Sequence, residues 1–307
     1  MHQEYTQDRR VMHYGRVNNP VKADERLPRS AAHLYVPADN RRLVESALRR
    51  RVATVILDLE DAVSPARKEQ ARDSLGEQVA SLRGSQRIWI RVNEGEDGLA
   101  DLAVLVSLDI AEGFWIPKSA DNPHFHQAVR VIRDAGAKLG IIVESARGIL
   151  EISSLLDGNP GAWLQVGAVD LRADIGMAAD SSIVGRDLDP ILTTVLLAAR
   201  RFEVAELVAP VTPDFHDLAH LSESSRHLAD LGFTSRACIH PNQIDPIDQV
   251  FVPTYEDLRR ARHSLRAFAD AAKEGMGAYV DHDNRMADAA TVRSSRALIE
   301  RFGRGSE

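Results

Sequence analysis

Short strand-like runs alternate with helical patterns from residue 29 onward, and this alternation constrains the fold more than any other feature. The runs end near Val36, Glu60, Asn93, Lys118, Glu144, Asp170, Val211 and Pro241. Alternating strands and helices predict a parallel sheet, and eight such units over this length predict an α/β fold of the (β/α)8 TIM barrel type. A doubly wound open sheet is the rival fold. It usually has fewer strands and often a glycine-rich phosphate turn, and the sequence contains no G-x-G-x-x-G or Walker-type run.

The segments on either side of the barrel pattern differ from it. Residues 1–28 are polar without sustained periodicity, which predicts an N-terminal arm, and residues 29–245 form the predicted barrel. After it, Tyr255 to Lys273 and Ala289 to Phe302 have helical spacing, with a short strand expected near Tyr279. Because residues 246–307 show no evident core of their own, we expect a C-terminal helical lid that packs on a neighbouring subunit.

Composition excludes several classes of protein. A net charge of -7 over 307 residues, without a long basic run, argues against nucleic acid as the main partner. The single cysteine, Cys238, excludes an internal disulfide framework and fits a reducing compartment. No apolar stretch is long enough to span a membrane, and the amino terminus lacks the apolar region of a signal peptide. The expected location is cytoplasmic.

Two of the predicted strands end in a carboxylate. The run Lys138 to Val143 leads into Glu144, the run Trp163 to Val169 leads into Asp170, and residues 147–156 between them predict a crossover helix. Parallel strands place both acids at one edge of the sheet, where two hard oxygen ligands suit Mg²⁺. The alternative is that Asp170 caps the next helix and Glu144 pairs with Arg147. This unit alone does not decide between the two.

Other predicted strands also end in polar residues. Asp58 and Glu60 share one face of the second strand, Arg91 and Asn93 follow from the third, and Lys118 ends the fourth. A buried charge costs several kcal/mol unless it is paired or binds something. Each residue has a structural explanation, such as pairing of Arg91 with Glu60. The crowding of acids and bases at one rim favours a functional site.

These residues also carry a resemblance. The sequence resembles the citrate lyase beta-subunit-like family, which includes malyl-CoA and citramalyl-CoA lyases. The matching segments occur in the family's order and are Arg29-Ser30, Leu34-Tyr35-Val36-Pro37, Leu57-Asp58-Leu59-Glu60-Asp61-Ala62-Val63, Arg91-Val92-Asn93, Pro117-Lys118, Glu144-Ser145-Ala146-Arg147-Gly148, Gly167-Ala168-Val169-Asp170-Leu171, Gly232-Phe233 and Ile239-His240-Pro241-Asn242-Gln243. The resemblance implies a TIM barrel, Mg²⁺, an acyl-CoA substrate and a homotrimer.

The resemblance also assigns roles to residues. It implies that Glu144 and Asp170 bind the metal and that Arg91 binds the substrate. We assign a catalytic role to Arg91, and substrate binding to Arg29, Lys118, Asn93 and Glu60. The chain departs from the family pattern in three places, which are Ala38, Val169 and Ser235-Arg236. The first and last of these lie in loops expected to grip CoA, so they bear on substrate identity more than on reaction type.

Asp288 has two interpretations. Locally it is placed as the N-cap of the last helix. In the family, a Gly-Lys-Met-x-Asp segment forms a lid over the neighbouring subunit's site and supplies an acid/base aspartate, and Arg285-Met286-Ala287-Asp288 matches its latter part, with Asn284 in place of the glycine. We favour catalysis.

The predicted function is a Mg-dependent lyase that cleaves a citramalyl-CoA or malyl-CoA type thioester. The products would be acetyl-CoA and a 2-oxo acid, pyruvate or glyoxylate. Three alternatives stay open: a citrate lyase beta subunit acting on a citryl thioester, a malyl-CoA thioesterase, and a non-catalytic binding barrel.

Overall fold

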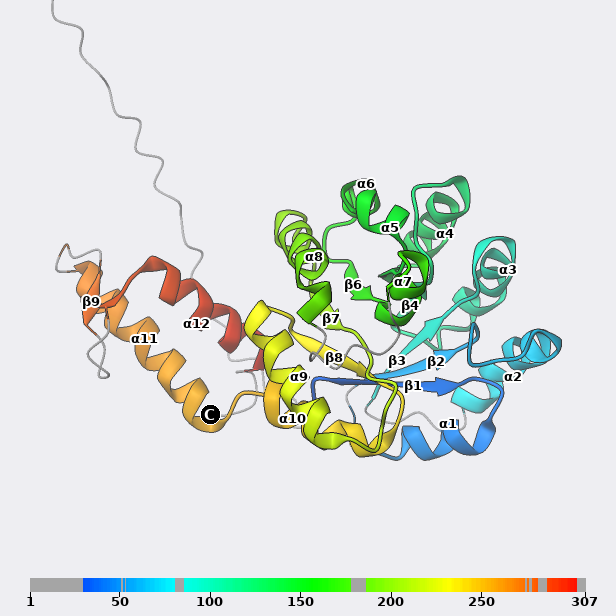
Figure 1. Ribbon diagram of the computed structural model, residues 1–307, viewed down its shortest axis with the longest axis horizontal. Coiled ribbons are helices and arrows are strands. Elements are labelled where there is room, and N and C mark those ends of the chain that lie inside the picture. The colour runs from blue at the N-terminus through cyan, green and yellow to red at the C-terminus, as the bar shows by residue number, and fades with distance from the viewer. Residues whose placement is uncertain are drawn as a thin grey trace, which may run out of the picture.

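A closed barrel of eight parallel strands forms the body of the molecule (Figure 1). The computed structural model describes residues 30–50, 52, 54–80, 86–177, 186–273, 275, 278–280 and 286–302. Each strand pairs with the next, and β8 closes the barrel on β1. The strands are β1 (Ala32–Pro37), β2 (Thr54–Asp58), β3 (Arg87–Arg91), β4 (Gly113–Ile116), β5 (Lys138–Val143), β6 (Trp163–Val166), β7 (Glu206–Ala209) and β8 (Ser235–Cys238). The predicted TIM barrel is confirmed.

Helices connect the strands and cover the outside of the barrel (Figure 1). They are α1 (Arg41–Leu48), α2 (Lys68–Ala80), α3 (Gly95–Leu105), α4 (Pro123–Asp134), α5 (Ala146–Leu150), α6 (Ile152–Leu156), α7 (Ala168–Asp174), α8 (Asp189–Arg201) and α9 (Leu218–Leu231), with 3-10 turns at Pro65–Arg67, Val106–Leu108, Arg186–Leu188 and Pro241–Gln243. The apolar outer faces of the strands and the inner faces of the helices form one continuous core.

A layer of tryptophans fills the inside of the barrel. The rings of Trp89 and Trp163 stack with their centroids 4.0 Å apart, and Trp115 packs at an angle to both. Gly140 makes room for this layer, because a Cβ there would lie only 2.4 Å from the Trp115 ring. Trp163 is the first residue of β6, so the layer lies toward the amino ends of the strands and leaves the polar residues at the carboxyl ends.

The helix α10 (Ile244–Phe251) belongs to the barrel. It packs on α9, β8 and β1, and Ile247 and Phe251 are buried. Asp248 accepts hydrogen bonds from the Ser30 hydroxyl and the Ala31 amide, which fixes the entry to β1. The predicted boundary after residue 245 falls inside this helix, so the barrel unit extends at least to Phe251.

A helical hairpin follows and projects from the barrel (Figure 1). The helices α11 (Tyr255–Lys273) and α12 (Ala289–Phe302) pack on each other, and β9 (Tyr279–Val280) pairs with β10 (Met286–Ala287). One ion pair joins the end of α12 to the barrel floor, with Arg301 Nη2 2.6 Å from Glu206 Oε1 at the first residue of β7. The hairpin is therefore attached at the amino end of the barrel, opposite the carboxyl ends of the strands.

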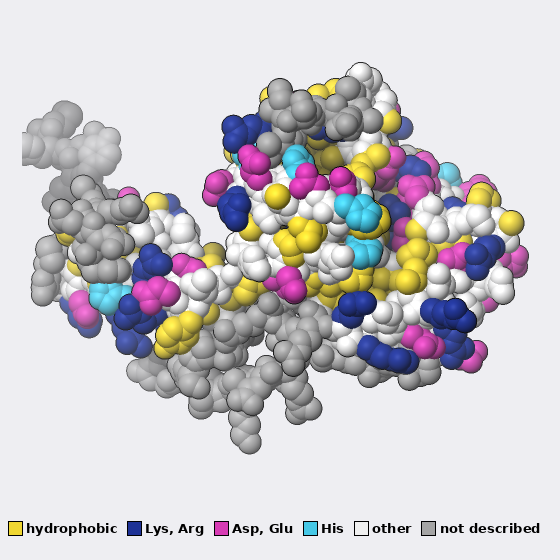
Figure 2. Space-filling view, turned by 60° about the horizontal axis from the view of Figure 1, so that its bottom comes forward, with side chains coloured by type: hydrophobic (Ala, Val, Ile, Leu, Met, Phe, Trp, Pro, Cys, Tyr) yellow, Lys and Arg dark blue, Asp and Glu magenta, His cyan; other side chains and the backbone are white. Residues whose placement is uncertain are grey.

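Two features bear on possible partners, the apolar character of the helices and the distribution of surface charge. No helix in the described part of the chain has the length and apolar character needed to cross a bilayer. In Figure 2, basic and acidic side chains are interspersed over both the barrel and the hairpin.

Candidate active site

Four of the predicted site residues meet at the carboxyl ends of β2 to β5. Glu60, Arg91 and Glu144 are buried or nearly so, and Lys118 is half-exposed at the rim. Each follows or ends its strand, as expected for the catalytic face of this fold. The sequence interpretation placed several strand ends two or more residues too late, because the polar residues themselves lie in the turns that follow the strands.

Arg91 is held on two sides by carboxylates. Its Nε lies 2.7 Å and its Nη2 2.5 Å from the two oxygens of Asp58, while its Nη1 lies 3.0 Å from Glu60 Oε2. Burial would lower the pKa of Arg91, but the bonds to Asp58 outweigh it and raise the pKa. A guanidinium has five N–H groups, of which two donate to Asp58, while the contact with Glu60 is an ion pair. The predicted pairing with Glu60 is present together with the stronger bidentate pair.

Lys118 links two of the acids. Its Nζ lies 2.8 Å from Glu60 Oε1, and its backbone N–H donates to Glu144 Oε1 at 2.6 Å. The residue has a φ of 45°, in the left-handed region that non-glycine residues rarely adopt. Strain of this kind costs on the order of 1–3 kcal/mol and gathers at functional sites. Here it turns the amide toward Glu144 while the side chain reaches Glu60.

The Glu144 side chain packs against Gly167, in the turn that follows β6. A Cβ on Gly167 would lie 2.2 Å from Glu144 Oε2, so only glycine fits there. Burial, together with the charges of Glu60 and Asp170, raises the pKa of Glu144 to about 8, although the Lys118 amide and Arg91 lower it. The carboxyl group therefore lacks a cation of its own that would hold it ionised.

Asp170 lies in the first turn of α7, three residues after Gly167. This corrects the prediction that it ends a strand, since β6 stops at Val166 and the chain turns at Gly167 where Glu144 packs. The structural alternative is also wrong. Gly167 occupies the cap position without a side-chain bond, and Arg147 pairs with Glu151 instead of Glu144.

The two acids fit a magnesium ion. Among the described residues, neither Glu144 nor Asp170 forms an ion pair, and no group of three or more His, Cys, Asp or Glu side chains is placed to hold a metal. Mg²⁺ is commonly bound by one or two carboxylates, with waters and substrate oxygens in its other positions. Two neighbouring acids, neither of them in an ion pair with a described residue, match that pattern.

Asn93 is held in a separate network. Its amide nitrogen donates to Asp101 Oδ2 at 2.8 Å, and its oxygen accepts from the Lys68 ammonium. Arg72 also contacts Asp101, at 3.2 Å. Because both ends of the amide are engaged, the structure places Asn93 as a support for the turn after β3, and substrate binding by it stays a prediction.

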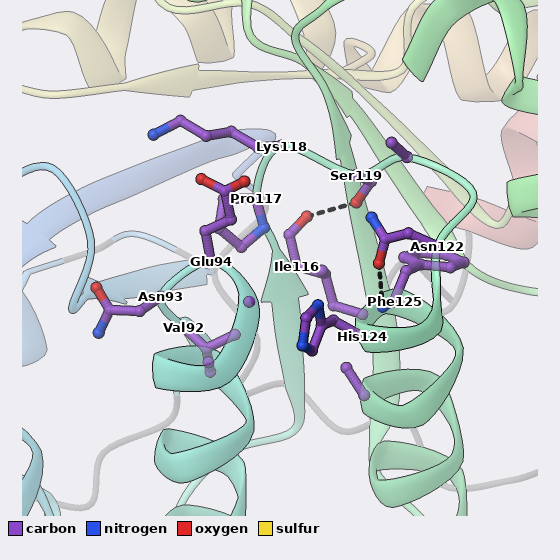
Figure 3. A pocket seen from close by; sticks show the side chains of 14 residues that line it. Val92, Asn93, Glu94, Ile116, Pro117, Lys118, Ser119, Asn122, His124 and Phe125 are labelled. Atoms are coloured by element: carbon purple, nitrogen blue, oxygen red, sulfur yellow. Dashed lines mark hydrogen bonds between the residues drawn. The ribbon is translucent and has the colours of Figure 1, made fainter. Parts of the chain in front are cut away.

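A cleft opens beside Lys118 between the first turns of α3 and α4 (Figure 3). In Figure 3, His124 points into this cleft, while Asn93 points away from it and the Lys118 side chain extends beyond its rim. Ser119 and Asn122 close one wall through hydrogen bonds to Ile116 O and from Phe125 N. Of the site residues, Asn93 and Lys118 line this cleft, whereas Glu60, Glu144 and Asp170 do not.

Asp288 caps α12 in this structure. Its Oδ1 accepts hydrogen bonds from the amides of Ala290 at 2.9 Å and Thr291 at 3.1 Å, and these lower its pKa. It lies at the far end of α12 from Arg301, which contacts the barrel floor. The structure therefore does not bring Asp288 to the mouth of its own barrel. Arg29, Asn284 and Arg285 lie outside the described residues.

Comparison with known proteins gives the family. The model of the HpcH/HpaI aldolase/citrate lyase family matches residues 31–241, which covers the whole barrel from β1 to the end of β8. This chain belongs to that family. The resemblance predicted from the strand-end motifs is confirmed, and the family consists of enzymes that act on carbon–carbon bonds.

Members of the HpcH/HpaI aldolase/citrate lyase family cover nearly the full chain. A citrate lyase subunit beta-like protein of Mycobacterium tuberculosis is 30% identical over 88% of this chain and 94% of its own. The mitochondrial citramalyl-CoA lyase of Homo sapiens is 30% identical over 82% and 79%. The crystal structure of Mycobacterium tuberculosis CitE with magnesium, acetoacetate and coenzyme A has a TM-score of 0.70 at 29% identity and covers 89% of this chain and 98% of that one.

The structure adds residues that sequence reasoning missed. Tyr35 lies under the Arg91 guanidinium, 5.1 Å from it, and donates a hydrogen bond to Gln165 Oε1 at 2.9 Å. Alternation along β1 points His33 and Tyr35 inward, and that signal was available. The role of Gly167 had no such signal, because it depends on a side chain from the neighbouring strand.

Proposed function

We propose that this protein is a magnesium-dependent lyase that cleaves a β-hydroxyacyl-CoA thioester of the citramalyl-CoA or malyl-CoA type. The observation that carries the proposal is the pairing of Glu144 with the turn that bears Asp170, without a permanent cation on either acid. Membership of a family of carbon–carbon lyases, and a solved relative that holds magnesium and coenzyme A, support the same chemistry.

Glu144 and Asp170 would hold the metal. When bound, magnesium would polarise the substrate oxygens and ease deprotonation of the hydroxyl group. Because Glu144 carries a pKa of about 8, cation binding must displace a proton from it near neutral pH. The metal would then stabilise the charged form of Glu144, which burial disfavours.

Arg91 would stabilise the charge that develops on the thioester oxygen. The N–H groups that do not bond to Asp58 are donors, and the guanidinium is held between Asp58 on one side and Glu60 on the other. Preorganised donors of this kind are effective because they do not reorganise during the reaction. Glu60 contacts both Arg91 and Lys118, so it acts as a positioning residue in this arrangement. Lys118, half-exposed at the rim, would meet a substrate carboxylate from its place beside Glu60.

Asp288 would act on the site of a neighbouring chain. The hairpin that carries it is attached to the amino end of its own barrel through Arg301. In a homotrimer with exchanged lids, Asp288 would exchange a proton with the enolate carbon. In the single chain its capping bonds lower its pKa, so burial against the neighbouring site would be needed before it could donate a proton.

The test is a product analysis with purified protein. We expect citramalyl-CoA or malyl-CoA, with Mg²⁺, to yield acetyl-CoA together with pyruvate or glyoxylate, and chelation with EDTA to stop the reaction. Release of the free hydroxy acid and CoA would instead indicate a thioesterase. A reaction that needs an added acyl-carrier protein would indicate a citrate lyase beta subunit. No turnover and no Mg²⁺-dependent binding across the panel would contradict the proposal.

A further inference from the structure

One hydrogen bond crosses the interior of the barrel. The Tyr35 hydroxyl on β1 donates to Gln165 Oε1 on β6 at 2.9 Å, and these two strands are not neighbours in the barrel. Both side chains point inward, because Tyr35 packs against the apolar cluster inside the barrel and Gln165 is in register with two of its members, Ile142 and Val208. We call the pair of Tyr35 and Gln165 the crossbar.

The crossbar lies one step below the acids of the mouth. Side chains alternate along a strand, so the next position on the inner face after Gln165 is Gly167, against which Glu144 packs. The Tyr35 ring centroid lies 5.1 Å from the Arg91 guanidinium. Burial raises the pKa of Tyr35, and the charges that act on its hydroxyl include those of Arg91, which lowers the pKa, and Glu144, which raises it. The crossbar therefore forms the base of the mouth.

The Gln165 amide has donors to spare. Besides the oxygen that accepts from Tyr35, a carboxamide carries two N–H donors, and none of the described residues accepts a hydrogen bond from Gln165 Nε2. Buried side-chain atoms without a partner do occur in the described part of this barrel, such as His33 Nδ1 and Thr54 Oγ1, but Gln165 Nε2 is not one of them. Nε2 therefore faces the open space of the mouth.

A purely structural crossbar is the alternative. Burying an amide costs free energy unless its polar atoms are bonded, and Tyr35 satisfies only the oxygen of Gln165. The neighbours in register, Ile142 and Val208, are apolar, so an apolar residue would meet the needs of packing at this level. A fixed amide with its donors toward the mouth suits an acceptor atom on a ligand.

We propose that Gln165 is a specificity-determining residue whose Nε2 donates a hydrogen bond to an oxygen of the oxo-acid half of the substrate. This inference rests on the proposed function, since it takes the β-hydroxyacyl thioester as the substrate. Glu144 packs on the turn that follows β6 and Asp170 comes directly after that turn, so the part of the substrate that meets the metal would lie above Gln165. Tyr35 is a positioning residue, because its hydroxyl holds the amide oxygen and thereby orients the donors.

The experiment measures binding of a 2-oxo acid apart from turnover. Pyruvate and glyoxylate are titrated by calorimetry, with Mg²⁺, into wild type and into Gln165→Met, which keeps the length of the side chain but has no donor. We expect the Kd of the oxo acid to rise about 5- to 150-fold, the range that 1–3 kcal/mol for a lost hydrogen bond gives at 1.4 kcal/mol per tenfold. The Kd of Mg²⁺ alone should stay the same, because Glu144 and Asp170 are unchanged.

Two further variants separate ligand binding from packing. Tyr35→Phe keeps the ring beside Arg91 and removes only the hydroxyl that orients the amide, so it should weaken oxo-acid binding by less than Gln165→Met, again with the Kd of Mg²⁺ unchanged. Ile142→Val removes one methyl group at the same level of the barrel and should leave the Kd of the oxo acid unchanged. If Gln165→Met does not fold, Tyr35→Phe decides, and an unchanged Kd of the oxo acid in it would overturn the inference.

The remaining outcomes separate this inference from the proposed reaction. Equal oxo-acid affinity in wild type and Gln165→Met would overturn the inference, as would an equal loss in Ile142→Val or a parallel loss of Mg²⁺ affinity, both of which would make the crossbar purely structural. If wild type cleaves the thioester while Gln165→Met binds the oxo acid unchanged, only this inference fails. If wild type binds the oxo acid through Gln165 but cleaves no thioester, only the proposed reaction fails.

Discussion

The two ends of the barrel each bury a cluster of charged residues, and the clusters differ in how their charges are balanced. At the amino end, Glu206 contacts Arg301 at 2.6 Å and His33 at 3.8 Å. Burial would raise the pKa of Glu206, but these neighbours outweigh it and lower the pKa to about 2. At the carboxyl end, burial raises the pKa of Glu144 to about 8.

The two clusters differ in whether the chain itself supplies enough cations to balance the buried acids. The floor holds an acid whose cation is supplied by the chain itself, through the last helix. The mouth holds Glu60, Glu144 and Asp170 near two cations, and Arg91 is already engaged by Asp58. An additional divalent cation would complete the mouth, whereas the floor needs none. Buried charge alone therefore does not identify an active site. Buried acids that lack a balancing cation from the chain do.

The largest effect is expected from removing the acids at the mouth, and it tests the difference between the two ends directly. Glu144→Gln and Asp170→Asn should each abolish Mg²⁺-dependent turnover and Mg²⁺ binding, while circular dichroism shows a folded barrel. The matched variant at the floor, Glu206→Gln, should lower the midpoint of thermal unfolding but leave kcat unchanged. Normal turnover in either mouth variant would refute the metal assignment, and loss of kcat in Glu206→Gln would refute the division of roles between the two ends.

A smaller loss is expected at Arg91. Removal of a preorganised donor to a developing oxyanion costs ~10²–10³-fold in kcat, so Arg91→Ala should lose at least about 10²-fold. The substitution also leaves Asp58 and Glu60 buried without their cation, which lowers the free energy of unfolding by ~3–5 kcal/mol. Unfolding in urea measures this loss of stability.

Arg91→Lys separates catalysis from stability at this position. It keeps the charge but not the forked geometry, so it should restore much of the stability without restoring kcat. If stability and kcat return together, Arg91 is only a structural ion pair at the mouth, equivalent to Arg301 at the floor.

The same comparison explains how far the sequence alone reaches. The barrel and most helices follow from apolar periodicity, which is local, and the helix over residues 255–273 agrees with α11 (Tyr255–Lys273) at both ends. The run through Glu60 was predicted as strand, yet β2 ends at Asp58 because the Asp58 carboxylate accepts the amides of Glu60 at 2.9 Å and Ala62 at 3.3 Å. That local competition with the sheet is typical of aspartate.

Specific side-chain contacts between segments distant in the sequence could not be predicted from the sequence alone. The predicted single helix over residues 147–156 is divided into α5 and α6 at Glu151, whose side chain accepts from the Asp121 amide at 2.6 Å and from Arg147. The proximity of Glu144 and Asp170 was predictable because parallel strands place their ends together. The floor pair was not, because Arg301 and Glu206 lie in parts of the chain that no strand register relates.

The smallest expected effect, on stability against pH, sharpens the comparison because the two ends should respond with opposite sign. In the metal-free protein the folded pKa of Glu144, about 8, lies above the ordinary value of 4.5 for a glutamate side chain. Its contribution to stability is therefore complete below pH ~4.5 and is lost as the pH rises through about 8. For Glu206 the folded pKa of about 2 is lowered, so its contribution is present above pH ~4.5 and is lost as the pH falls toward 2.

Each pKa unit corresponds to ~1.4 kcal/mol, so both contributions are on the order of a few kcal/mol. Urea unfolding in EDTA, from pH 3 to 9, gives the free energy of unfolding of each variant and of the wild type. The difference between the two at each pH measures the contribution. The pKa of Glu60 is raised as well, and the difference from Glu144→Gln isolates Glu144. Glu144→Gln should remove part of the decline between pH ~4.5 and about 8, and Glu206→Gln part of the loss as the pH falls from ~4.5 toward 2. If Glu144→Gln leaves the decline between pH ~4.5 and about 8 unchanged, Glu144 is ionised without a metal, and the mouth is as complete as the floor.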